Sequence, residues 1–272
     1  MPLTRRTADN GVTFYASPLL ERAGVPHAFS TRVGGVSPAP FDSLNLGIAG
    51  GTDLKDTQAN LDENYRRLAV AAGGGLVGRE RCWVSQVHGA DVCHVAPAAA
   101  FTSGVNADAL VTADPARMLS VKYADCVPIL LATADGRAVA AVHAGWRGVI
   151  AGVIGAAAAR LRDLAGAPEA PLLAAVGPCI SAPHFEVGPV VAAEFERAFG
   201  AAAPIAWPRG SAGKPHVDLV RAVRLQLGTL GIGDDRADSA DLCTFANAGE
   251  FFSHRRDGPA TGRMAVLVAP AA

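Results

Sequence analysis

Cys126-Val-Pro-Ile-Leu-Leu-Ala-Thr-Ala-Asp-Gly-Arg-Ala-Val-Ala-Ala-Val-His143 contains two apolar runs joined by a short polar connection. The runs, residues 129–133 and 138–142, have the length and bounding residues of β-strands. The connection Ala134-Asp-Gly-Arg137 contains a glycine and has a length that joins antiparallel neighbours. This stretch therefore predicts a β-hairpin and argues against a purely parallel sheet.

The hairpin is flanked by segments of both secondary-structure types. Further strand-like runs at 83–87, 118–121 and 263–268 are bounded by Gly, Pro, Asp or Asn. Apolar residues recur at helical spacing in four other segments, namely 54–72, 149–164, 189–199 and 219–230. We therefore expect a mixed α/β fold. No polar or low-complexity stretch is long enough to divide the chain, which predicts a single domain over 1–272.

The composition limits the classes of partner. The chain has 24 Lys+Arg and 25 Asp+Glu, a formal net charge of −1, so it offers no broad attraction for a nucleic-acid backbone or an anionic membrane. Half of the residues are hydrophobic, which is enough to form a large core. Small-molecule substrates are the expected partners, and the composition does not indicate an oligomeric state.

The sequence also predicts a cytoplasmic location. The start, Met1-Pro-Leu-Thr-Arg-Arg6, is not followed by the apolar region of a secretory signal. The longest apolar helical segment, 149–159, is too short to cross a bilayer. The cysteines are odd in number and widely scattered, which favours reduced thiols over a disulfide framework. They are Cys82, Cys93, Cys126, Cys179 and Cys243.

Two histidines and one cysteine lie at the edges of strand-like runs. His88 is in Gln86-Val-His-Gly, Cys126 follows Asp125, and His143 ends the second run of the hairpin. Zinc with three protein ligands keeps a fourth position for water or substrate, whereas structural zinc usually has four protein ligands. The set His88, Cys126 and His143 therefore predicts a catalytic metal site, with these three residues as the catalytic group.

The neighbours of these residues suggest supporting roles. If 83–88 is extended, Gln86 and His88 share one face, so that Gln86 could support His88. Asp125 belongs to a turn-forming neighbourhood that lifts the Cys126 thiol out of the strand. Ligating histidines usually need an acceptor for their second ring nitrogen, and the sequence does not identify that acceptor.

Two arginines are candidate anion contacts. Arg147 stands where Gly145-Trp-Arg-Gly148 leads into a helical segment, whose first turn presents unpaired N–H groups. Arg32 stands beside two glycines in Thr31-Arg-Val-Gly-Gly-Val-Ser37, although a simple turn accounts for that stretch equally well. Gln86 and Asp125 complete the candidate substrate- and phosphate-binding residues.

Three alternatives to a zinc site remain open. The histidines could be hydrogen-bonded structural residues and Cys126 a small buried hydrophobe. Cys126 could instead be a nucleophile without a metal, with His143 or His88 as its base and Asp125 or Gln86 as orienter. Copper also accepts two histidines and one cysteine, but the seven histidines contain no His-X-His pair for a multinuclear cluster.

Several motifs of the chain, in the same order and over residues 27 to 268, resemble those of the bacterial laccase-domain family. This family includes the peptidoglycan-editing factor and purine-nucleoside-processing enzymes. The motifs are Thr31-Arg-Val-Gly-Gly-Val-Ser37, Gln86-Val-His-Gly-Ala90, Asp108-Ala-Leu-Val-Thr112, Ala124-Asp-Cys-Val-Pro128, Val142-His-Ala-Gly-Trp-Arg-Gly148, Gly177-Pro178 and Phe251-Phe-Ser-His-Arg-Arg-Asp-Gly258.

The resemblance implies a layered α/β/β/α sandwich with mixed sheets and a zinc site at His88, Cys126 and His143. It implies phosphorolysis of adenosine, inosine, guanosine and methylthioadenosine, together with adenosine deamination, whereas the older polyphenol-oxidase label implies copper. Phosphorolysis needs phosphate near C1′, for which Arg32 and Arg147 are the candidates. The alternatives are an amide hydrolase that removes misincorporated serine from peptidoglycan precursors, and a binding module without catalysis.

Overall fold

The hairpin expected from the sequence forms the centre of the fold. In the computed structural model, which describes residues 1–48, 51–97, 99–207 and 213–271, strands β8 (Val127–Thr133) and β9 (Val139–Ala144) pair antiparallel. Their connection turns at Gly136, whose φ of 71° lies in the left-handed region that glycine adopts without strain. Cys126 immediately precedes β8 and His143 lies near the end of β9, so the two residues reach the same end of the hairpin.

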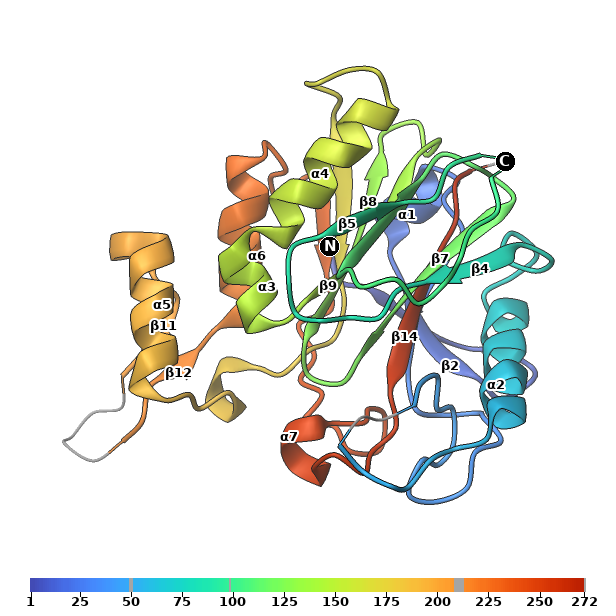
Figure 1. Ribbon diagram of the computed structural model, residues 1–272, viewed down its shortest axis with the longest axis horizontal. Coiled ribbons are helices and arrows are strands. Elements are labelled where there is room, and N and C mark those ends of the chain that lie inside the picture. The colour runs from blue at the N-terminus through green and yellow to red at the C-terminus, as the bar shows by residue number, and fades with distance from the viewer. Residues whose placement is uncertain (49–50, 98, 208–212, 272) are drawn as a thin grey trace.

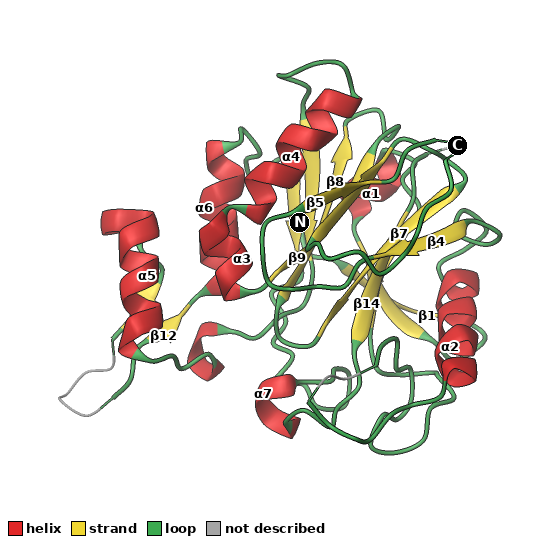
Figure 2. Ribbon diagram, in the orientation of Figure 1, coloured by secondary structure: helices red, strands yellow, loops and turns green. Residues whose placement is uncertain are grey.

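Two mixed six-stranded sheets form the body of the molecule (Figure 2). The first sheet has the order β13 (Ala237–Ser239), β10 (Leu172–Val176), β8, β9, β6 (Ala109–Thr112) and β5 (Val92–His94). The second has the order β1 (Thr4–Thr7), β2 (Thr13–Ala16), β3 (His27–Ser30), β14 (Met264–Val268), β7 (Arg117–Tyr123) and β4 (Glu80–Trp83). A short ladder of β11 (Ile205–Ala206) and β12 (His216–Val217) stands apart.

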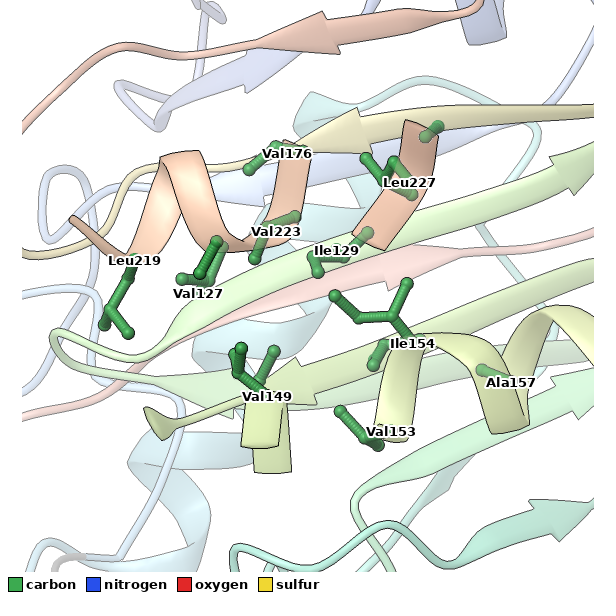
Figure 3. Packing of buried hydrophobic residues seen from close by; sticks show 14 of the residues in the cluster. Val127, Ile129, Val149, Val153, Ile154, Ala157, Val176, Leu219, Val223 and Leu227 are labelled. Carbon is green, nitrogen blue, oxygen red and sulfur yellow. The ribbon is translucent and has the colours of Figure 1, made fainter. Parts of the chain in front are cut away.

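Because side chains alternate along each strand, both faces of the sheets pack and three hydrophobic cores form between the layers of helices and strands. On one face of β8, Val127 and Ile129 pack against α3 (Trp146–Ala151), α4 (Val153–Leu164) and α6 (Leu219–Thr229) (Figure 3). On its other face, Leu130 packs with residues of the second sheet, including Val121. The outer face of the second sheet packs against α2 (Gln58–Ala71).

The resulting order of layers is helix, sheet, sheet, helix (Figure 1). The expected mixed α/β fold and α/β/β/α sandwich are confirmed, and the hydrophobic core that the two sheets share makes them parts of one domain. The remaining helices are α1 (Pro18–Arg22), α5 (Pro189–Phe199), α7 (His254–Asp257) and the 3₁₀ turns η1 (Ala182–His184) and η2 (Gly200–Ala202).

The helix predictions need two corrections. The segment expected as one helix over 149–164 is two helices, because Gly152 between them has a φ of 83°, which a continuous right-handed helix cannot contain. The helix expected from residue 54 begins at Gln58, because the Thr57 hydroxyl caps it by accepting the N–H of Asn60. The helix expected over 189–199 has those bounds.

The strand expected over 83–87 is mostly absent, with only an isolated parallel bridge of Ser85 to Asn106 beyond its first residue. Strand β4 ends at Trp83, and the backbone N–H groups of Val87, His88 and Gly89 point to the carboxylate of Asp108 instead of a neighbouring strand. The shared face inferred for Gln86 and His88 therefore does not exist.

Among the described residues, the helices are all too short or too polar to cross a lipid bilayer.

Candidate metal centre

The structure brings His88, Cys126 and His143 together at one end of the two sheets. One ligand atom of each residue lies within 4.8 Å of the others. The Cys126 Sγ is 3.9 Å from His88 Nε2, and the two imidazole rings lie 5.0 Å apart with an interplanar angle of 76°. Two imidazoles and one thiolate at this separation have the donor types that zinc prefers and need only a small contraction to bind one ion.

Asp108 holds two of the three candidate ligands. Its carboxylate accepts a hydrogen bond from Nδ1 of His143 at 2.8 Å, which leaves Nε2 of that ring free to bind a metal. The same carboxylate accepts the backbone N–H groups of His88 at 3.0 Å and Gly89 at 2.6 Å. These bonds fix His88 at a φ of 62°, so Asp108 orients one ligand by its ring and the other by its backbone.

Asp125 organises the third ligand from the preceding position. Its φ is 86°, and its buried carboxylate accepts hydrogen bonds from Thr244 Oγ1 at 2.6 Å, Ser253 Oγ at 3.0 Å and the N–H of Arg255 at 2.6 Å. These contacts tie the turn before β8 to the loop that leads into α7. The Asp125 oxygens predicted to bind substrate are thus bonded to the protein's own donors.

Gly145 leaves the space that the metal ligands occupy. A Cβ at this position would lie 2.8 Å from Cδ2 of His88 and 3.1 Å from Sγ of Cys126. Either distance is shorter than ordinary van der Waals contact between these atoms. The glycine in Val142-His-Ala-Gly therefore allows the ligand side chains to approach each other.

The charges of Cys126 and His143 are coupled. Burial by itself raises the pKa of the Cys126 thiol, but the charge and hydrogen bond of His143 outweigh burial and lower that pKa. Burial likewise lowers the pKa of His143, but the Cys126 thiolate and Asp108 outweigh it and raise that pKa. Without a metal, the pair favours thiolate beside imidazolium. A divalent cation has to displace the imidazolium proton when it binds.

A cavity of about 390 Å³, here called the basic cavity, opens onto the three ligands. Lys122 and Arg263 contribute its positive charge, and none of the described carboxylates forms an ion pair with either. Burial, with a smaller effect from Arg81 and Arg263, lowers the pKa of Lys122. The lining residues are Ile48, Gln86, His88, Lys122, Tyr123, Ala124, Cys126, His143, His254 and Arg263.

Lys122, Arg263, Asp108 and His254 were not among the site residues predicted from the sequence. Lys122 was detectable as a cation directly after the apolar run 118–121 in β7. Arg263 entered the prediction only as the first residue of the strand-like run 263–268. Nothing in the sequence places Asp108 beside His143, because the two residues are far apart in the chain and meet only through the pairing of β6 with β9.

The other residues predicted to bind substrate or phosphate lie in different parts of the structure. Gln86 lines the basic cavity, but its side chain donates to the carbonyl of Lys122 at 2.6 Å and accepts its N–H at 2.8 Å. Arg32 lines a different cavity of about 310 Å³ and donates to the carbonyls of Asp42 and Ala248. Arg147 is exposed and lies 4.5 Å from the ring centroid of Trp146, outside the lining of the basic cavity.

The part of the chain that contains these residues matches a known protein family. Residues 26–271 match the family described as multi-copper polyphenol oxidoreductase laccase. The chain belongs to this laccase-like family. The resemblance inferred from the motifs is thereby confirmed, and the match includes all three candidate metal ligands.

Relatives within the laccase-like family cover nearly the whole chain. The purine nucleoside phosphorylase of Deinococcus radiodurans is 40% identical over 253 residues, which are 92% of each protein. The purine nucleoside phosphorylase YfiH of Escherichia coli is 36% identical over 245 residues, covering 90% of this chain and 93% of that protein. The crystal structure of YlmD from Geobacillus stearothermophilus superposes with a TM-score of 0.84 at 29% identity and covers 100% of both chains.

Proposed function

We propose that this chain is a metal-dependent purine nucleoside phosphorylase. The observation that carries the proposal is the open group of three ligand residues facing a cavity that contains Lys122 and Arg263. A phosphate co-substrate needs positive charge, and a metal with a free position needs an accessible side. The names of the relatives support the same activity. We expect adenosine, inosine, guanosine and methylthioadenosine as substrates.

Zinc is the metal that we propose for His88, Cys126 and His143. When bound, a zinc ion would supply Lewis-acid chemistry and activate water near neutral pH, which the proposed deamination of adenosine requires. Copper accepts the same donors. However, the described residues contain a single group of three or more His, Cys, Asp or Glu able to hold a metal, which favours one ion over a multinuclear copper cluster.

The residues of the basic cavity suit phosphorolysis. A phosphate oxygen attacks C1′ of the ribose while the bond from C1′ to N9 breaks. The electron pair of that bond passes to the purine, which takes up a proton. Lys122 and Arg263 would bind and orient the phosphate, and their charge would offset the negative charge of the attacking oxygen. Gln86 holds the backbone of Lys122 in place.

Product analysis tests the proposal. Zinc-loaded protein incubated with inosine and phosphate should release hypoxanthine and ribose 1-phosphate, with no hypoxanthine when phosphate is omitted. Cys126→Ala should lose both the bound zinc and the activity. Cys93→Ala is the matched control, because Cys93 is a free thiol of β5 outside the ligand group. Metal-replete protein that leaves all four nucleosides unchanged would refute the proposal.

We also propose a cytoplasmic location. Among the described residues, all five cysteines are free, including the candidate ligand Cys126. A reducing compartment would keep that thiol available for the metal. Fractionation of cells that produce the protein at its natural level, followed by immunodetection, tests this expectation.

A further inference from the structure

A second, smaller cavity adjoins the basic cavity. It has a volume of about 190 Å³, and Ala124, Cys126 and His254 line both cavities. The two spaces therefore adjoin at one of the candidate metal ligands. A volume below the range of about 300–1,000 Å³ typical of whole small-molecule sites is suited to one fragment of a larger ligand.

The walls of the smaller cavity, here called the apolar cavity, come from elements outside the metal centre. Trp146 begins α3, Leu219 begins α6, and Phe185 follows the 3₁₀ turn η1. Leu219 and Phe185 are buried, and Trp146 is half-buried. Two aromatic rings and an aliphatic side chain form a surface that favours a flat heterocycle.

The charged groups of the apolar cavity are already bonded within the protein. The carboxylate of Asp125 accepts three hydrogen bonds, from Thr244, Ser253 and Arg255. The guanidinium of Arg255 donates to the carbonyl of Glu186 at 2.9 Å and lies 5.3 Å from the ring centroid of Phe185. A phosphate entering this cavity would meet one cation, Arg255, together with the carboxylate of Asp125. The basic cavity instead offers two cations, Lys122 and Arg263, and has no carboxylate among its lining residues.

We propose that the apolar cavity binds the purine base, while the basic cavity binds phosphate, so that Trp146, Phe185 and Leu219 determine which bases the enzyme accepts. This assignment rests on the proposed phosphorylase activity. It places C1′ of the nucleoside at the junction of the cavities, beside Cys126. His254 lies at the same junction, within reach of either the base or the ribose.

Enlarging the apolar cavity tests the assignment through a gain of activity. Trp146→Ala removes one wall, and the variant should accept purines that carry a bulky group. We expect the ratio of kcat/KM for N6-benzyladenosine to that for adenosine, both measured as phosphorolysis, to rise roughly tenfold. The KM for phosphate should stay within about twofold of the wild-type value, because uncoupled sites respond independently. Leu219→Ala opens a different wall and should shift the ratio in the same direction.

Two further variants complete the experiment. Trp207→Ala is the matched control, since Trp207 is exposed and lines neither cavity, and its substrate ratio should equal that of the wild type. Lys122→Met should raise the KM for phosphate roughly tenfold with little change in the KM for adenosine.

The outcomes separate the two proposals. Wild-type protein without phosphorolysis would defeat the proposed function itself. Active wild type with unchanged substrate ratios in folded Trp146→Ala and Leu219→Ala, as judged by circular dichroism, would overturn the cavity assignment alone. So would a reversal, in which Trp146→Ala raises the KM for phosphate and Lys122→Met raises the KM for adenosine.

Discussion

Asp108 shows how one buried side chain can prepare a metal site before any ion arrives. Burial would raise the pKa of its carboxyl, but hydrogen bonds from His143 and the N–H of Gly89 outweigh burial and lower that pKa. The group therefore remains a carboxylate while it orients His143 and His88. Residues that orient ligands in this way typically contribute about 10- to 100-fold to metal affinity.

Replacement of Asp108 should weaken metal binding without removing a ligand. We expect Asp108→Asn to raise the Kd for zinc by about 10- to 100-fold, because an amide cannot hold Nδ1–H of His143 as a carboxylate does. Competition with a chromogenic chelator measures the change. The exposed Asp163→Asn serves as control, and equal zinc affinity in the two variants would contradict the role given to Asp108.

Gly145 provides a steric test of the same centre. In Gly145→Ala the added methyl group would overlap His88 and crowd Cys126, so the ligand atoms have to separate. We expect zinc occupancy after dialysis to fall at least roughly tenfold relative to wild type, the effect expected of a disturbed ligand environment. Elemental analysis of folded protein gives the occupancy, and full retention of zinc would show that the site can relax around the methyl group.

For single residues, the sequence identified the candidate metal ligands but not the residues that orient them or line the cavity beside them. His88, Cys126 and His143 were recognisable because each stands at the edge of an apolar run. The contacts of Asp108 and the position of Lys122 depend on strand pairings between distant segments, such as β4 with β7 and β6 with β9. Local spacing carries no information about those pairings.

Among the secondary-structure elements, α3 and α4 contain two glycines with different roles, Gly152 at the junction of the helices and Gly155 inside α4. Gly152 has a φ of 83° and no atom within 4 Å of an added Cβ, so a substitution there is strained only by the backbone. Gly155 lies inside α4 with equally open space and no such φ. The two glycines are close in sequence, but Gly152 has a left-handed backbone conformation and Gly155 a helical one.

Opposite effects on stability should follow from the same substitution at these two sites. Gly152→Ala should lower the free energy of unfolding by about 1 kcal/mol, because left-handed geometry disfavours a Cβ. Gly155→Ala should raise it by about 0.5–1 kcal/mol, because alanine is the better helix former. Urea unfolding measures both values, and a loss of stability in both variants would contradict this explanation.

The elements themselves were predictable to different degrees. The hairpin follows from two apolar runs joined by a glycine-containing turn, because both faces of its strands are buried. Helix α5 follows from its helical periodicity. The break at Gly152 was missed because the apolar pattern continues across it. The stretch 83–87 was mistaken for a strand because the N–H of Val87 and those of the next two residues bond to the carboxylate of Asp108. An apolar pattern does not reveal a side-chain acceptor of this kind.

Across the whole molecule, Asp238 connects the two sheets. It lies in β13 of the first sheet, and its buried carboxylate accepts Ser17 Oγ at 2.7 Å and the N–H of Leu19 at 2.9 Å, just after β2 of the second. Burial would raise the pKa of Asp238, but the hydrogen bond from Ser17 and the other donors outweigh burial and lower it. This contribution to stability is present above the unfolded-state pKa of about 3.9 and is lost as pH falls through the lower folded-state pKa.

The stability of Asp238→Asn should therefore depend less on pH than that of the wild type. At pH 7 the variant should unfold with a free energy lower by about 1–3 kcal/mol, because a charged acceptor has been replaced. The difference should shrink at pH values below about 4, where the wild-type carboxylate takes up a proton. Denaturant unfolding across this range checks the trend, and a constant difference down to pH 2 would contradict it.

The ligand residues also come from both layers of the sandwich. His88 follows β4 of the second sheet, whereas Cys126 and His143 belong to the β8–β9 hairpin of the first. An ion held by all three would cross-link the two sheets at their interface. Removal of the ion should then speed amide hydrogen exchange at that interface, around β4 and β9. The amides of α2, which lies far from the ligands, should keep their protection from exchange.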